Sequence, residues 1–102
     1  MKKPNECKSM EEIRNAIDEI DQAIISLIAD RALYVDAAAS FKKDPQAVKA
    51  DDRVKAMLQK RAEWATAKGL KPEIIVKIYS ELVNFFIAEE MHKWEMKDKQ
   101  QK

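Results

Sequence analysis

The amino-acid sequence predicts an all-α fold of three helices, the first of them unusually long. Only one of its 102 residues is glycine, so few positions favour the positive φ angles of tight hairpin turns. The chain is rich in Ala, Lys and Glu, which have high helix propensity. Apolar residues also recur every three or four positions, as one face of a helix requires. These observations predict a single helical domain spanning residues 1–102.

The first helix is expected to begin behind Ser9 and to run to Asp44-Pro45. Ser9 and Glu12 have the spacing of a capping box, and no helix breaker follows before the proline. A helix of roughly 33 residues is about 50 Å long, whereas a globule of 100 residues is about 26 Å across. One compact monomer cannot cover such a helix, so we expect a homodimer.

The second helix is expected from Asp51 or Asp52, as its N-cap, to Gly69, which suits the left-handed conformation that often ends a helix. The third begins with Pro72 in its first turn and extends to about Lys97, after which the polar end should fray. The inner face of the third helix consists of Ile74, Ile75, Ile78, Tyr79, Leu82, Val83, Phe86 and Ile87.

Composition excludes several classes of function. Nineteen Lys and Arg against 18 Asp and Glu give a net charge of +1, which lacks the basic excess of proteins that bind nucleic acid or acidic membranes. One cysteine, Cys7, and one distant histidine, His92, do not suffice for a zinc site or a Cys–His nucleophile. We expect no metal and no cofactor. The basic start of the chain is not followed by an apolar segment, so we expect a cytoplasmic protein.

Two cations stand out along the first helix. Arg31 interrupts its apolar stripe and needs a carboxylate or a bound anion as partner, unless its long side chain reaches the surface. Lys42 lies eleven residues later, close to three turns, which predicts the same face about 16 Å further along. Lys42 either opens a lid over 43–50 or complements the helix dipole. The stripe itself is Ile13, Ile17, Ile20, Ile24, Leu27, Arg31, Tyr34, Ala38 and Phe41.

Glu90 is the opposite anomaly, because it lies on the apolar stripe of the third helix, four residues after Phe86 and four before Trp94. Away from water a carboxyl group favours its neutral form, whereas a nearby Arg or Lys favours the charged one. A structural ion pair with Arg31 explains this position as well as a functional role does. A helical cavity with several cations, one carboxyl and no nucleophile suits a small dianion whose reaction needs restraint and electrostatic stabilisation.

Six short motifs then extend over nearly the whole chain. They are Glu12-Ile-Arg14-x-Ala-Ile-Asp18-x-Ile-Asp21, Arg31 with Tyr34-Val35, Phe41-Lys42, Arg53-Val54-x-Ala-Met57-Leu58, Arg61-Ala-x-Trp64-Ala and Ile87-Ala-Glu89-Glu90-x-x-x-Trp94. In these motifs the chain resembles the AroQ-type chorismate mutase family, and most closely its branch of isochorismate pyruvate lyases from siderophore salicylate synthesis. The resemblance implies an intertwined all-helical homodimer in which the long first helices span both subunits.

The resemblance also implies roles for individual residues. Arg14 would reach across from the other subunit, and together with Arg31 it would bind the two carboxylates of the substrate. Lys42 would close the lid over the ether-linked enolpyruvyl group, with Arg53 as a secondary contact and Glu90 facing the ether oxygen. The wall that holds the ring would consist of Ala38, Met57 and Ile87.

Two positions bear on the branch of the family. Mutases commonly have a glutamate that meets the substrate hydroxyl where this chain has Val54, which favours a lyase that converts isochorismate to salicylate and pyruvate, with weak mutase activity on chorismate. The lyase branch has glutamine at the position of Glu90, whereas some mutases have glutamate. The alternatives are therefore a chorismate mutase, an amino-chorismate mutase, or a catalytically inactive helical dimer that acts as a regulatory partner.

Overall fold

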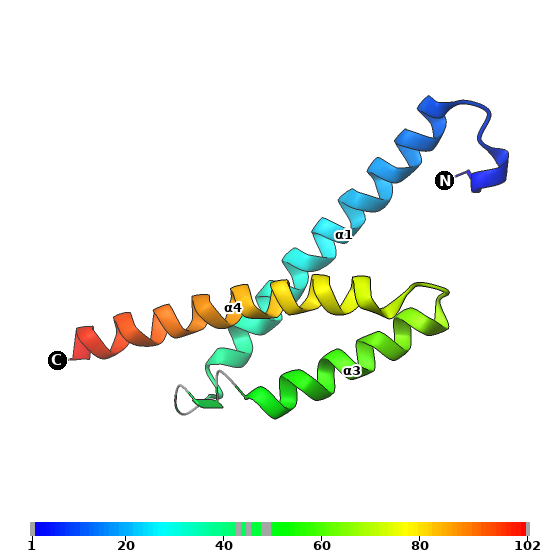
Figure 1. Ribbon diagram of the computed structural model, residues 1–102. Coiled ribbons are helices and arrows are strands. Elements are labelled where there is room, and N and C mark those ends of the chain that lie inside the picture. Colours follow the sequence, from blue (N-terminus) through cyan, green and yellow to red (C-terminus); the bar gives the residue numbers. More distant parts are fainter. Residues whose placement is uncertain (1, 43, 45, 48–49, 102) are drawn as a thin grey trace. The chain divides into compact units, whose positions relative to one another are not determined.

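The computed structural model describes residues 2–42, 44, 46–47 and 50–101 of the chain (Figure 1). Its helices are η1 (Pro4–Glu6), α1 (Met10–Ala39), α3 (Asp51–Ala67) and α4 (Pro72–Gln101). These described residues form no strand, which confirms the prediction of an all-α chain with three main helices. The chain divides into two compact units, Met1–Tyr34 and Val35–Lys102, and each is described by itself.

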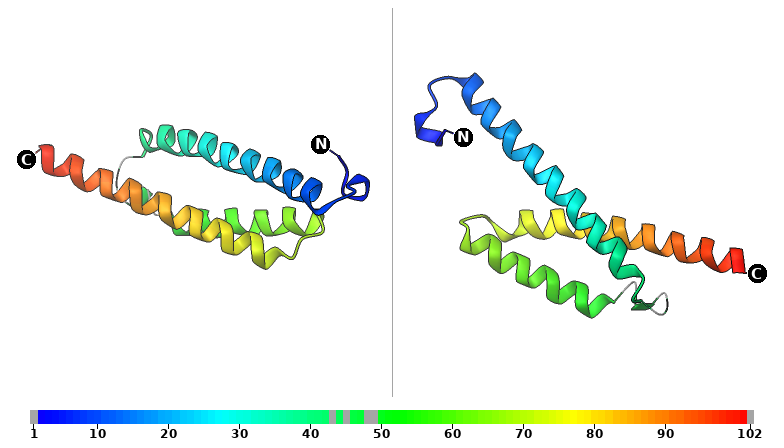
Figure 2. Two further views of the ribbon diagram at one scale, coloured as in Figure 1. Left: turned by 90° about the horizontal axis from the view of Figure 1, so that it is seen from above. Right: turned by 180° about the vertical axis from the view of Figure 1, so that it is seen from behind.

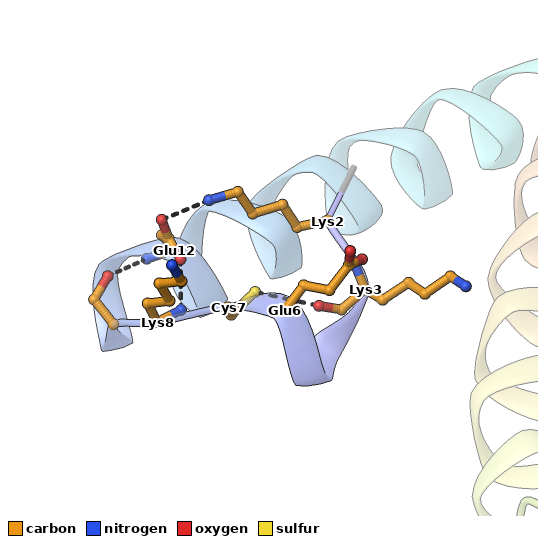
Figure 3. Close-up of polar contacts among 7 residues, drawn as sticks. Lys2, Lys3, Glu6, Cys7, Lys8 and Glu12 are labelled. Carbon is orange, nitrogen blue, oxygen red and sulfur yellow. Dashed lines mark hydrogen bonds and ion pairs between the residues drawn. The ribbon is translucent and has the colours of Figure 1, made fainter.

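The start of α1 is fixed by hydrogen bonds of the N-terminal unit (Figure 3). The Ser9 hydroxyl accepts a hydrogen bond from the Glu12 amide at 3.1 Å, as the capping box requires. The Glu12 carboxylate accepts a hydrogen bond from the backbone amide of Lys8 at 2.6 Å. In a capping box the donor would be the next amide, that of Ser9. Lys2 adds an ion pair to the same carboxylate at 2.8 Å. The carboxylate therefore joins the N-terminal segment to the first turn of α1.

α1 ends at Ala39 rather than at Asp44, so the expected length of the first helix is wrong. The three residues after it donate their backbone amides to carbonyl groups three positions back. The Ser40 hydroxyl donates to the Ala37 carbonyl at 2.8 Å, and the Ser40 amide donates to the same carbonyl. This local competition for carbonyl groups tightens the chain into a turn. Lys42 consequently lies outside the helix, and the expectation that it shares a helix face with Arg31 is wrong.

The segment expected to form a lid, 43–50, falls in part on residues 43, 45, 48 and 49, which lie outside the described residues. At its end, Ala50 is the N-cap of α3 and has a left-handed φ of 34°. The prediction of an aspartate N-cap is therefore wrong. Asp51 and Asp52 lie in the first turn of the helix instead, where the dipole favours negative charge.

α3 and α4 form a helical hairpin, which Figures 1 and 2 show from three sides. Gly69, with a φ of 79°, ends α3 as predicted. Its amide donates to the Thr66 carbonyl and the next amide, of Leu70, donates to the Ala65 carbonyl, which is a Schellman motif. Pro72 begins α4 as predicted, and the helix continues to Gln101, past the expected end near Lys97.

Packing between α3 and α4 is centred on Ala65 and Val83, which are buried. Arg61 of α3 adds a cation–π contact to each helix, because its guanidinium carbon lies 5.1 Å from the ring centroid of Trp64 and 5.3 Å from that of Tyr79. Many large apolar side chains stay exposed on the single chain. In the part of the chain that the structure describes, no helix is long and apolar enough to cross a membrane.

The contacts of Glu12 predict a pH dependence of the first turn of α1. The hydrogen bond from Lys2, followed by that from the Lys8 amide, holds the pKa of Glu12 below its usual value. A lowered folded-state pKa stabilises the fold above the unfolded value, and this stabilisation is lost as the pH falls through the folded value. We expect the helical ¹³Cα shifts of residues 10–13 to decrease below pH ~4.

The substitution Glu12→Gln should remove most of this pH dependence and leave the first turn less helical at pH 7. Glu11→Gln, in the same turn, is the matched control and should keep the wild-type profile. Identical profiles for the wild-type protein and the Glu12→Gln variant would contradict the account.

Candidate functional site

A cavity of about 220 Å³ lies in the C-terminal unit, where the chain leaving α1 meets the C-terminal half of α4. An apolar cavity of about 150 Å³ holds a benzene molecule, so this one has room for a six-membered ring with a small substituent. Its lining combines an ammonium group, a carboxylate and an indole ring with small residues. The lining residues are Ala39, Ser40, Lys42, Glu90, Lys93 and Trp94.

The central feature of the cavity is an ion pair between Lys42 and Glu90. Lys42 Nζ donates to Glu90 Oε2 at 2.8 Å, although the two residues are 48 positions apart. The Glu90 side chain is only 6% exposed and that of Lys42 is 25% exposed. A carboxylate this buried requires a cation or hydrogen-bond donors. Glu90 therefore lies on the inner face of α4, as its position in the apolar stripe indicated, and the partner found in this unit is Lys42.

A second ion pair lies beside the first. Lys93 Nζ contacts Asp36 Oδ1 at 2.7 Å, with side chains that are 61% and 63% exposed. The hydrogen bond from Asp36, followed by its charge, raises the pKa of Lys93, and the charges of Glu89 and Glu90 act in the same direction. Lys93 lines the cavity and Asp36 does not. This ammonium group therefore stays charged at neutral pH, with the cavity on one side and a solvent-exposed carboxylate on the other.

The structure brings together two of the predicted site residues, Lys42 and Glu90, and leaves the others away from the cavity lining or in the other unit. Arg14 is exposed and Arg31 half-buried, and both belong to the N-terminal unit. Four further predicted residues belong to the C-terminal unit but do not line this cavity, and their contacts with substrate stay predictions. They are Ala38 and Arg53, which are exposed, and Met57 and Ile87, which are half-buried.

Sequence reasoning did not assign Ser40 and Lys93 to the site. Lys93 follows Glu90 by three residues, so the helical period places both on one side of α4 and could have identified it. Ser40 follows the end of α1 at Ala39, and the pattern of apolar residues did not predict that the helix ends there. Trp94 was part of the last sequence motif without a role of its own, and the structure places it in the cavity wall.

The chemistry available to this cavity is electrostatic. Its hydroxyl group, on Ser40, donates to a backbone carbonyl, and the carboxylate that lines it, of Glu90, is paired with Lys42. Among the described residues, no three His, Cys, Asp or Glu side chains are grouped so that they could hold a metal ion. Lys42 and Lys93 can bind and stabilise negative charge. The arrangement suits an anionic ligand that needs charge stabilisation rather than a covalent intermediate.

Comparisons with known proteins identify the family that the chain resembles. Residues 13–91 match the protein family described as chorismate mutase type II. The isochorismate pyruvate lyase of Pseudomonas aeruginosa is 38% identical to this chain over 94 residues, which covers 92% of the chain and 93% of that relative. The family match includes Lys42 and Glu90 and ends before Lys93 and Trp94.

The buried ion pair predicts a strong coupling between positions 42 and 90. Lys42→Met should lower the free energy of unfolding at pH 7 by about 1–3 kcal/mol, less than the ~3–5 kcal/mol of a fully buried pair, because Lys42 keeps partial contact with water. Combining it with Glu90→Gln should recover most of the loss, since no buried charge is then left unpaired.

Urea denaturation of both single variants and the double variant, at one protein concentration, measures this coupling. Lys77→Met, at an exposed position of α4 outside the cavity, is the control and should change stability little. Strictly additive effects at 42 and 90 would show that the ion pair does not stabilise the fold.

Proposed function

Since the chain belongs to the type II chorismate mutase family, as its sequence motifs indicated, we propose that it is an isochorismate pyruvate lyase. In this reaction the ether C–O bond of isochorismate breaks while one ring hydrogen moves to the methylene carbon of the enolpyruvyl group. The products are salicylate and pyruvate, and the protein neither takes nor supplies a proton. The observation that carries the proposal is the Lys42 ammonium group, held on the cavity wall by the buried Glu90.

The role of Lys42 follows from the charge that develops on the ether oxygen as the C–O bond breaks. An ammonium group fixed in a partly desolvated cavity stabilises this charge better than water does, because it is already oriented. Ala39 and Trp94 restrict the space beside it and favour a folded substrate. Val54, where mutases commonly have glutamate, supports the lyase over the mutase.

Glu90 acts in one of two ways, depending on its protonation. The ionised carboxylate accepts from Lys42 and holds that side chain in the cavity, which is the arrangement in this structure. A neutral carboxyl can instead donate a hydrogen bond to the ether oxygen. The glutamine that the lyase branch has at this position can donate a hydrogen bond in the same way. We therefore assign Glu90 a donor role in the reacting complex.

A second copy of the chain is part of this proposal. Five residues of the α1 stripe, spaced by four and three, are between 38% and 66% exposed on the single chain: Ile13, Ile17, Ile20, Ile24 and Leu27. A continuous apolar stripe of this length marks an interface. A homodimer through α1 would cover it and would let Arg14 of one subunit reach the substrate carboxylates bound by the other.

The direct test is to incubate the purified protein with isochorismate and with chorismate in parallel. Salicylate and pyruvate in equal amounts from isochorismate, formed much faster than prephenate from chorismate, are the expected result. Prephenate alone would assign the protein to the mutases, for which the carboxyl group of Glu90 is the supporting observation. No product from either substrate would favour the inactive regulatory dimer.

The donor role of Glu90 predicts the pH dependence of this reaction. A carboxylate cannot donate a hydrogen bond whereas a neutral carboxyl or an amide can, so kcat/KM of the wild-type protein should depend on pH. The amide of Glu90→Gln donates at every pH, and this variant should have a flatter profile. At pH 8 it should be faster than the wild type by about tenfold, a fraction of the ~10²–10³ that one donor to a developing charge contributes. Parallel profiles would contradict the donor role.

The α1 stripe predicts the oligomeric state. Ile20→Glu places a charge in the apolar stripe and should convert the dimer to an 11.8 kDa monomer without turnover. Gln22→Glu adds the same charge outside the stripe and should remain an active dimer. Sedimentation equilibrium with both variants tests this, and a dimeric Ile20→Glu variant would locate the interface elsewhere.

A further inference from the structure

Lys93 is a cation of the cavity wall that no motif of the sequence pointed to. It lies on α4 three residues after Glu90 and directly before Trp94, and all three residues line the cavity. Its ammonium group contacts Asp36, which is in the last turns of α1 and outside the lining. The Lys93 side chain thus contacts Asp36 and also lines a cavity that an anionic ligand could enter.

The charges of the lining show why a further cation matters. Lys42 and Glu90 carry opposite charges and contact each other at 2.8 Å. Their electrostatic effects on an entering ligand therefore nearly cancel. Lys93 is the remaining charged residue of the lining. Within this unit, the attraction of the cavity for a dianion therefore depends on the position of the Lys93 ammonium group.

The two ion pairs differ in how easily they break. Removing the partner of a buried charge is costly, and Glu90 is only 6% exposed. Exposed pairs contribute little to stability, and both side chains of the pair between Lys93 and Asp36 are more than 60% exposed. Lys93 can exchange Asp36 for another carboxylate at small cost, whereas Lys42 cannot leave Glu90 without a replacement for its charge.

We propose that Lys93 is a ligand-binding residue that leaves Asp36 to bind a carboxylate group of the ligand at the mouth of the cavity. Asp36 competes with the ligand for this ammonium group and so weakens binding of mono- and dicarboxylates alike. The choice of a carboxylate-bearing substrate rests on the proposed function, but the binding of an aromatic dicarboxylate can be measured independently of it.

The experiment measures the dissociation constant of isophthalate, an unreactive aromatic dicarboxylate, by isothermal titration calorimetry. Lys93→Gln should weaken binding by about tenfold, the usual effect of losing one hydrogen bond to a charged group. Asp36→Asn should tighten binding by about threefold, because it releases the ammonium group from its competitor. The double variant should bind like Lys93→Gln alone. Lys77→Gln, at an exposed position of α4 outside the lining, is the matched control and should bind like the wild type.

The opposite directions of the two single variants separate a ligand contact from a purely structural ion pair. If the pair only stabilised the fold, Lys93→Gln and Asp36→Asn would change binding in the same direction, and that result would overturn the proposal. Wild-type protein that does not bind isophthalate would overturn it as well. Turnover of isochorismate without an effect of Lys93→Gln on binding contradicts this inference alone, whereas the binding effect without any turnover contradicts the proposed lyase function alone.

Discussion

The carboxylate of Glu90 imposes the main constraint on the C-terminal unit. It is buried on the inner face of α4, where a charge cannot remain without a partner. The partner is Lys42, which the chain presents just after the end of α1. The ion pair therefore joins two segments that are far apart in the sequence, and the cavity forms where they meet. Local stability and the proposed chemistry both depend on this contact.

This constraint also explains how the cavity can be both stable and reactive. In the free protein the ammonium group of Lys42 is satisfied by Glu90, so the fold does not carry an unpaired buried cation. In the proposed reaction, the same ammonium group stabilises the charge that develops on the substrate. The exposed pair of Lys93 and Asp36 supplies positive charge that can be redirected without the same cost. One buried pair and one exposed pair thus have different functions.

Three local capping features were predictable, whereas the end of α1, the N-cap of α3 and the long-range ion pair were not. Ser9, Gly69 and Pro72 act through their own turns, so the starts of two helices and the end of α3 followed from the sequence. The period of α4 was sufficient to place Glu90 on the inner face. The end of α1 was missed, because the Ser40 turn competes with a helix that propensity alone would continue. The pairing of Glu90 with Lys42 depends on that turn, and no local pattern encodes it.

The central claim is that Lys42 and Glu90 form the ion pair of the free protein, and that an anion bound in the cavity contacts this pair. The ¹³Cδ chemical shift of Glu90 at pH 7, measured by NMR with and without isophthalate, tests this directly. We predict that the shift changes when isophthalate binds, because the contact of the carboxyl group with Lys42 changes. A shift that saturating isophthalate leaves unchanged would contradict the account.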